Sequence, residues 1–107
     1  SLMRSAALIV QPSRFEGWST TVQDAKALGR PLLCSDLPVH REQAPGSMGF
    51  FPCDRADVLA DVLESLWPKL EPGPCLDTER LAHANEREFA RRYGETLLRI
   101  CEEACTA

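Results

Sequence analysis

No apolar run in this sequence approaches the roughly 20 residues that a membrane-spanning helix needs. The first four residues also lack the apolar core of a signal peptide, so we expect a cytoplasmic protein. Positive charge is scarce: 12 Lys and Arg stand against 16 Asp and Glu, for a net charge of −4. Because nucleic-acid binding needs a dense cationic surface, we expect no nucleic-acid partner.

Cysteine pairing of the kind that builds small secreted or zinc-bound domains is also missing. The five cysteines are odd in number, and none forms a Cys-x-x-Cys pair. We interpret them as reduced thiols. Cys101 and Cys105 have helical spacing, but two thiols do not complete a zinc site, so we expect neither a metal nor another cofactor.

The order of apolar runs and turn residues predicts an α/β fold. The apolar run at 6–11 and the run at 31–35 are typical of buried parallel strands, and a helix from Ser19 to Leu28 lies between them. Ser19 or Thr20 can cap this helix at its start, and Gly29 at its end. Strand, helix and strand in this order form a βαβ unit with a parallel strand pair.

The rest of the chain extends this pattern. We expect a helical turn at 39–43 and a strand at 49–51. Asp54 then caps a helix that has Trp67 in its core-facing apolar stripe. A last helical region begins at Asp77, and Gly94 breaks or kinks it. The predicted fold is a partial doubly wound, Rossmann-like parallel sheet.

Three strands are few for such a sheet. We therefore interpret residues 1–107 as a single partial domain, whose first strand would lie beside strands not present here. Folded alone, the chain could form a homo-oligomer through its exposed sheet edge.

Ligands of open α/β sheets bind beyond the carboxyl ends of the strands, which here means the loop and helix start at 12–21. Gly17 allows a ligand to approach the backbone closely, and the free amides near Ser19 and Thr20 suit a phosphate or diphosphate. Glu16 and Asp24 could accept hydrogen bonds from a vicinal diol. Each feature also has a structural interpretation: Glu16 as a loop carboxylate bonded to backbone amides, Asp24 on a solvated helix face, and Ser19 and Thr20 as plain caps.

Other polar and aromatic residues near this loop leave alternatives open. Arg14 lies on the loop and could contact the ligand, whereas Arg30 is expected at the far end of the sheet. Trp18 could stack on a base or sugar, although packing of the helix against the sheet is favoured. His40 is interpreted as the start of a surface helix, with a contact to a donor base or a contact in lobe closure as the alternative.

Together, these residues resemble a known family. Glu16-Gly17, then six residues, then Asp24-Ala25, followed by Gly29-Arg30-Pro31 and an apolar strand, is similar to the motif of glycosyltransferase family 4 (glycosyltransferases group 1). The likeness continues through 37–42 and 49–51, and weakly at 87–90. It implies the latter, nucleotide-sugar-binding part of the C-terminal lobe of a GT-B fold.

The resemblance implies a role for each matching residue. Glu16 would be the catalytic carboxylate near the donor sugar, Gly17, Trp18, Ser19 and Thr20 would face the diphosphate, and Asp24 would hold the ribose. The reaction would transfer a glycosyl group from a nucleotide diphosphate sugar to an acceptor, with retention and without a required metal. Asp24 stands where the family usually has Glu, and the middle of the motif also differs, which leaves the identity of the donor open.

The family's diphosphate-neutralising Arg and Lys, and its N-terminal lobe, are not part of this sequence. We therefore expect the chain alone to be inactive. The alternative is a non-catalytic module of Rossmann-like fold that binds a nucleotide sugar or another protein.

Overall fold

Three short parallel strands form one sheet in the computed structural model, which describes residues 2–106. They are β1 (Ile9–Gln11), β2 (Leu32–Ser35) and β3 (Gly49–Phe51), in the order β1-β2-β3. Every residue of β2 is buried, as expected for a continuous apolar run between two neighbours. The predicted mixed α/β fold with a parallel sheet is confirmed, although β1 begins three residues later than its apolar run.

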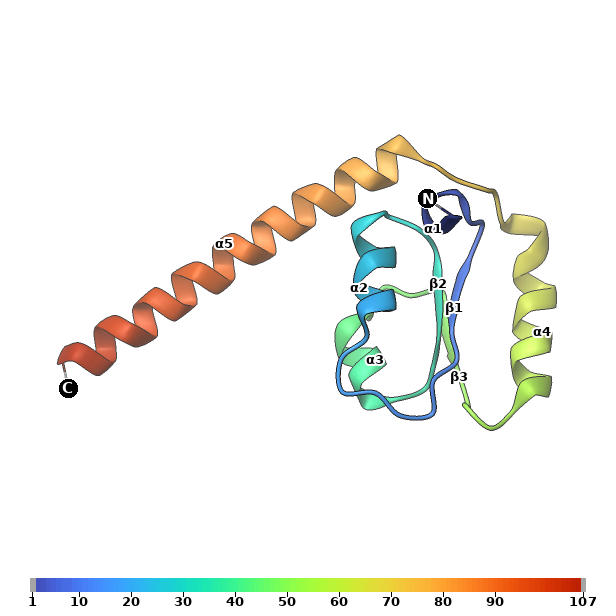
Figure 1. Ribbon diagram of the computed structural model, residues 1–107, viewed down its shortest axis with the longest axis horizontal. Coiled ribbons are helices and arrows are strands. Elements are labelled where there is room, and N and C mark those ends of the chain that lie inside the picture. Colours follow the sequence, from blue (N-terminus) through green and yellow to red (C-terminus); the bar gives the residue numbers. More distant parts are fainter. Residues whose placement is uncertain (1, 107) are drawn as a thin grey trace.

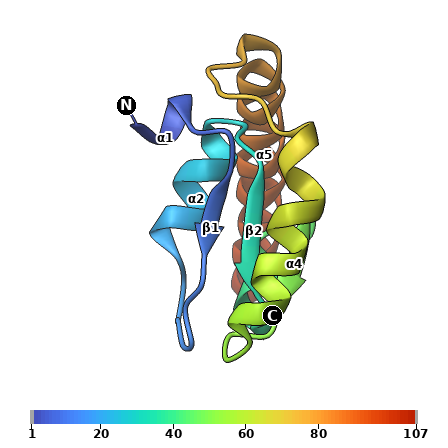
Figure 2. The ribbon, with the colours of Figure 1, turned by 90° about the vertical axis from the view of Figure 1, so that its right-hand side faces the viewer.

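Helices cover both faces of this sheet (Figure 1, Figure 2). Helices α2 (Thr20–Ala27) and α3 (Pro38–Gln43) lie on one side, and α4 (Ala56–Leu66) lies on the other. A short α1 (Leu2–Ser5) precedes β1, and the 3-10 turn η1 (Trp67–Lys69) follows α4. This layered arrangement leaves the loops after β1 and β2 at one edge of the sheet.

The residues that cap α2 are among those predicted from the sequence. Ser19 is the N-cap, and its hydroxyl accepts a hydrogen bond from the Val22 amide at 3.2 Å. Gly29 follows the helix with φ of 63°, the left-handed conformation that favours glycine. The predicted caps at both ends of the helix are confirmed. Of the two candidates for the N-cap, Ser19 rather than Thr20 occupies this position.

Two predictions about α4 are wrong. The helix begins one residue later than expected, so Arg55 occupies its N-cap position without a side-chain cap, and Asp54 lies outside it. Trp67 is 74% exposed, because the chain turns into η1 there and leaves the apolar stripe. The preceding stripe residues of α4 are half-buried.

The last helix, α5 (Leu76–Thr106), runs for 31 residues without interruption. The predicted break at Gly94 is therefore wrong. A glycine costs a helix only about 1 kcal/mol, and the ion pair between Arg91 and Glu95 spans this position. The first part of α5 packs near α2, whereas its second part projects away from the sheet (Figure 1). Across the part of the chain that the structure describes, no helix combines the length and apolarity needed to cross a membrane.

The interior is unusually rich in polar side chains for so small a sheet. Val22, Ala25 and Cys34 are fully buried in the core between α2 and the strands, and Leu33 of β2 is fully buried as well. The polar side chains that are buried beside them are Ser19, Arg30, Ser35, His40 and Gln43. Arg30 donates to the Ala6 and Glu71 carbonyls at 2.9 Å each, at the amino end of β1, which confirms its expected place far from the loop at 12–19.

Candidate functional site

The carboxyl ends of β1 and β2 are linked by a network of polar side chains. Gln11, the last residue of β1, donates from its amide nitrogen to the Ser13 hydroxyl and to Glu16 Oε1, both at 3.0 Å. Ser35, the last residue of β2, donates its hydroxyl to the Ser13 carbonyl at 2.5 Å. The loop after β1 is thereby tied to both strand ends.

Glu16 lies at the centre of this network. Its Oε2 contacts Nε2 of His40, and its side chain is 19% exposed. Burial raises the pKa of Glu16, but hydrogen bonds from His40 and Gln11 outweigh this effect and leave the pKa below its ordinary value. Glu16 is therefore held as an oriented carboxylate that still reaches the surface.

His40 is fully buried in α3, so its interpretation as a surface residue is wrong. Nδ1 lies 2.8 Å from the Ser35 carbonyl, which can only accept, and this contact places a proton on Nδ1. The contact between Nε2 and Glu16 then also needs a proton, which the two groups share.

Gln43, the last residue of α3, was not found by sequence reasoning. Its Oε1 accepts from the Ser19 amide at 3.1 Å, and its Nε2 donates to the Ser19 carbonyl at 2.6 Å. The side chain is fully buried, with 1% exposure. A single glutamine thus fixes the start of α2 against the end of α3.

The groups at this corner that remain open to a ligand are mainly backbone amides. The amides of Val22 and Gln23 both bond to Ser19. None of residues 2–106 accepts a hydrogen bond from the amides of Thr20 and Thr21, the first two residues of α2. Ser19 itself is 2% exposed and fully engaged, so its role in the structure is that of a cap.

The loop before α2 carries exposed side chains. A Cβ added at Gly17 would meet nothing within 4 Å, which leaves space above the backbone. Arg14 is exposed and forms no ion pair with another described residue. Phe15 is 89% exposed and Trp18 is 57% exposed, so the favoured packing of Trp18 between helix and sheet is wrong.

Asp24 is not part of the Glu16 network. It is exposed in the second turn of α2, and its side chain bonds to no residue of the described chain. Glu16, by contrast, is committed to His40 and Gln11. The two acids therefore occupy different environments, the first oriented by partners and the second free in solvent.

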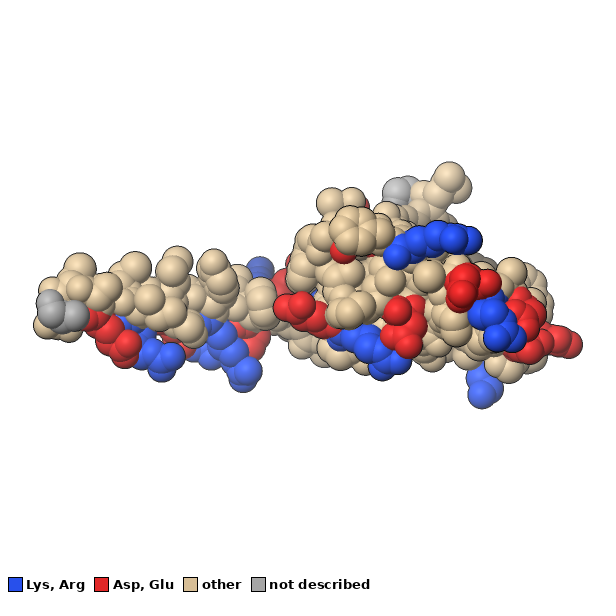
Figure 3. All heavy atoms as spheres, turned by 90° about the horizontal axis from the view of Figure 1, so that it is seen from below, with Lys and Arg blue, Asp and Glu red and all other residues tan. Residues whose placement is uncertain are grey.

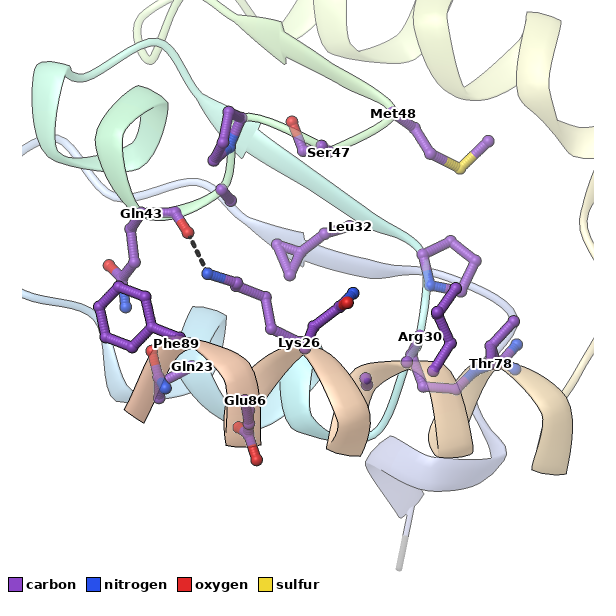
Figure 4. A pocket seen from close by; sticks show the side chains of 18 of the residues that line it. Gln23, Lys26, Arg30, Leu32, Gln43, Ser47, Met48, Thr78, Glu86 and Phe89 are labelled. Carbon is purple, nitrogen blue, oxygen red and sulfur yellow. Dashed lines mark hydrogen bonds between the residues drawn. The ribbon is translucent and has the colours of Figure 1, made fainter. Parts of the chain in front are cut away.

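A groove of about 880 Å³ lies elsewhere, between the first half of α5 and the body of the protein (Figure 4). Lys26 crosses it and donates to the Gln43 carbonyl at 2.5 Å, and Phe89 of α5 borders it. The groove includes 29–32 at the amino end of β2, whereas Glu16 and His40 lie at the carboxyl end. It is thus separate from the predicted ligand loop, and only Trp18 among the predicted ligand residues lines it.

Comparisons with protein-family models, curated proteins and solved structures gave no match to this chain.

Proposed function

We propose that this chain is the latter part of the nucleotide-sugar-binding lobe of a retaining glycosyltransferase with the GT-B fold, similar to family 4. The observation that carries the proposal is the joint placement of an oriented carboxylate, Glu16, and two uncommitted amides at the start of α2. Both lie beyond the carboxyl ends of parallel strands, where open α/β sheets bind their ligands.

The two ends of an activated sugar match these two features. As the bond between the anomeric carbon and the diphosphate breaks, negative charge develops on the leaving diphosphate and positive charge on the sugar ring. The amides of Thr20 and Thr21, the dipole of α2 and the cationic Arg14 favour the diphosphate. The carboxylate of Glu16 would face the sugar. The acceptor oxygen would form the new bond on the face that the diphosphate leaves, and its proton would pass to the departing diphosphate.

His40 acts in this proposal as a positioning residue. Its ring is held by the Ser35 carbonyl and presents Nε2 to Glu16. It therefore fixes the orientation of the Glu16 carboxylate and helps to lower its pKa. Asp24 is the candidate for contact with the ribose hydroxyls, because it is exposed and has no partner of its own in residues 2–106.

A titration of nucleoside diphosphates into the chain tests the proposal. Thr20 is the first residue of α2, a position where proline fits, and Ser19 before it has φ of −91° and ψ of 118°, which a following proline tolerates. Thr20→Pro therefore removes one amide donor without breaking the helix. We expect it to weaken binding of UDP, GDP or ADP about tenfold, the value of one hydrogen bond to a charged group.

The matched control is Thr20→Ala, which keeps the amide and removes only the hydroxyl, and it should bind close to normally. Equal affinity of the proline variant and the unchanged chain for the nucleoside diphosphate would refute binding by the amides at the start of α2. Because the chain lacks the family's other diphosphate-binding groups, we expect no glycosyl transfer by the chain alone. Turnover of a labelled nucleotide sugar would contradict that expectation.

The exposed Phe15 and Trp18 favour a second candidate, a module that binds another protein through this loop. This candidate predicts no nucleotide binding at millimolar concentration. It also predicts that Glu16→Gln leaves function intact, whereas a donor-binding lobe would lose transfer in a complete enzyme.

A further inference from the structure

A shallow hollow of about 400 Å³ lies on the first half of α5. Four exposed residues line it: Arg80, His83, Ala84 and Arg87. At roughly 100° per residue, these positions share one side of the helix and lie within about 100° of each other. Phe89, which borders the groove beside the body, lies on the opposite side of the helix. The hollow therefore faces away from the groove and is a separate surface.

Three of the four lining side chains can donate hydrogen bonds to an anion, and the fourth is small. A guanidinium group presents paired donors that match the oxygens of phosphate, and the imidazole ring of His83 offers an N–H group. Arg80 and Arg87 are seven residues apart, which is about 10 Å along the helix axis. Ala84 lies between them, so both guanidinium groups can reach a compact anion that sits above its methyl group.

The two arginines of the hollow have no ionic partner in the described range 2–106. Neither Arg80 nor Arg87 forms an ion pair there. The acids next to them in the sequence are committed elsewhere: Glu79 bonds to Arg4, and Glu88 bonds to the two arginines that follow it. The donors of both guanidinium groups therefore remain available to a ligand.

The rest of α5 balances its charges differently. On the projecting half, basic and acidic side chains lie next to each other along one side of the helix (Figure 3). Arg91, for example, bonds to Glu88 and Glu95, both at 2.6 Å. Around Arg87, by contrast, basic side chains stand four residues before it and four residues after it. Like charges at this spacing destabilise a helix, and a bound anion would reduce that repulsion.

We propose that this hollow binds a dianionic phosphate group, either free inorganic phosphate or a phosphate monoester. The guanidinium groups of Arg80 and Arg87 approach a tetrahedral dianion from two directions, and His83 donates to a further oxygen. Because the hollow is open, the oxygen that points to solvent is free to carry an ester group. The site shares no residue with the loop at 12–19 or the start of α2, so it does not depend on the proposed glycosyltransferase function.

Two-dimensional NMR of the ¹⁵N-labelled chain tests this site. Inorganic phosphate at pH 8 is the first probe, with the ionic strength held constant by sodium chloride. We expect saturable shifts of the amides at 80–87 and of the side-chain Nε–H groups of Arg80 and Arg87. Glycerol phosphate is the second probe. Binding of both assigns the site to monoesters, whereas binding of inorganic phosphate alone assigns it to the free ion.

Charge-matched variants locate the binding. Arg87→Gln should weaken phosphate binding about fivefold, the value of a strong exposed ion pair. Arg99→Gln is the control, because it removes another exposed arginine of α5 that forms no ion pair with a described residue and lies outside the hollow. It should bind phosphate normally. Ala84→Glu places a carboxylate on the floor of the hollow and should abolish saturable binding, while circular dichroism shows unchanged helicity.

Three results would overturn the proposal. The first is a set of shifts that sodium chloride reproduces at the same ionic strength, which indicates screening alone. The second is equal loss of phosphate affinity in Arg87→Gln and Arg99→Gln. The third is saturable shifts confined to residues 12–21, which would place the anion at the start of α2 instead.

Discussion

Replacing Gln43 by alanine should destabilise the protein far more than an exposed glutamine would. The change removes both hydrogen bonds from Gln43 to the backbone of Ser19. The Ser19 carbonyl still accepts from the Gln23 amide at 3.2 Å, so only the Ser19 amide loses its partner. An orphaned buried donor costs about 1–3 kcal/mol, and the lost packing of a fully buried side chain adds to this. We expect the free energy of unfolding to fall by about 2–4 kcal/mol.

Urea denaturation followed by circular dichroism measures this difference. The control is Gln23→Ala, on the exposed face of α2, which should stay within about 0.5 kcal/mol of the unchanged protein. If the two alanine variants unfold at the same urea concentration, Gln43 does not fix the start of α2. The inference that the first-turn amides are held in place for a ligand would then lose its basis.

Further expectations concern single residues. Gly29→Ala should destabilise the protein by about 2 kcal/mol or more in the same assay, because the added Cβ would lie 2.5 Å from the backbone of α5 at a φ of 63°. Gly94→Ala, with nothing within 4 Å, should stabilise α5 by about 0.5–1 kcal/mol, and a loss of stability there would contradict the open helical environment. Because partners hold the pKa of Glu16 below its ordinary value of 4.5, the charged form stabilises the folded state above that pH, and this stabilisation is lost as the pH falls through the lowered pKa. The unfolding free energy of Glu16→Gln should therefore fall less steeply with acid than that of the unchanged protein, and parallel curves would exclude the effect. Burial raises the pKa of Cys34 to about 11, so a thiol reagent at pH 8 should label Cys101 in the native protein and spare Cys34, and equal labelling rates would disprove the burial.

Elements of the fold could be predicted from the sequence where short stretches of neighbouring residues determine them. The apolar runs of β2 and β3 and the cap at Gly29 each depend on neighbouring residues and were predicted correctly, and Ser19 was one of two predicted N-caps. The position of Glu16 beyond β1 followed from the same reasoning, because a loop after a parallel strand lies at the carboxyl edge of the sheet.

The partners of Glu16 could not be predicted in this way. His40 lies 24 positions along the chain from Glu16, in the first turn of the short α3 that begins at Pro38, where no periodic pattern marks a buried face. The contact between Gln43 and Ser19 spans the same separation. Both depend on how α3 packs beside α2, and an isolated polar residue in a six-residue helix gives no sign of that packing.

The buried polar contacts explain how so small a sheet can fix the geometry of the loops and the helix start at the carboxyl ends of β1 and β2. An apolar core tolerates shifts between elements, because its contacts have no preferred direction. The contacts of Ser35, His40 and Gln43 are directional, and each joins two different elements near the carboxyl edge. A shift of α3 would break several of them at once and leave buried polar groups unpaired. The orientation of Glu16 and the start of α2 are therefore coupled through α3. If the first-turn amides bind a nucleoside diphosphate as proposed, a change at the buried Gln43 should alter that affinity as well.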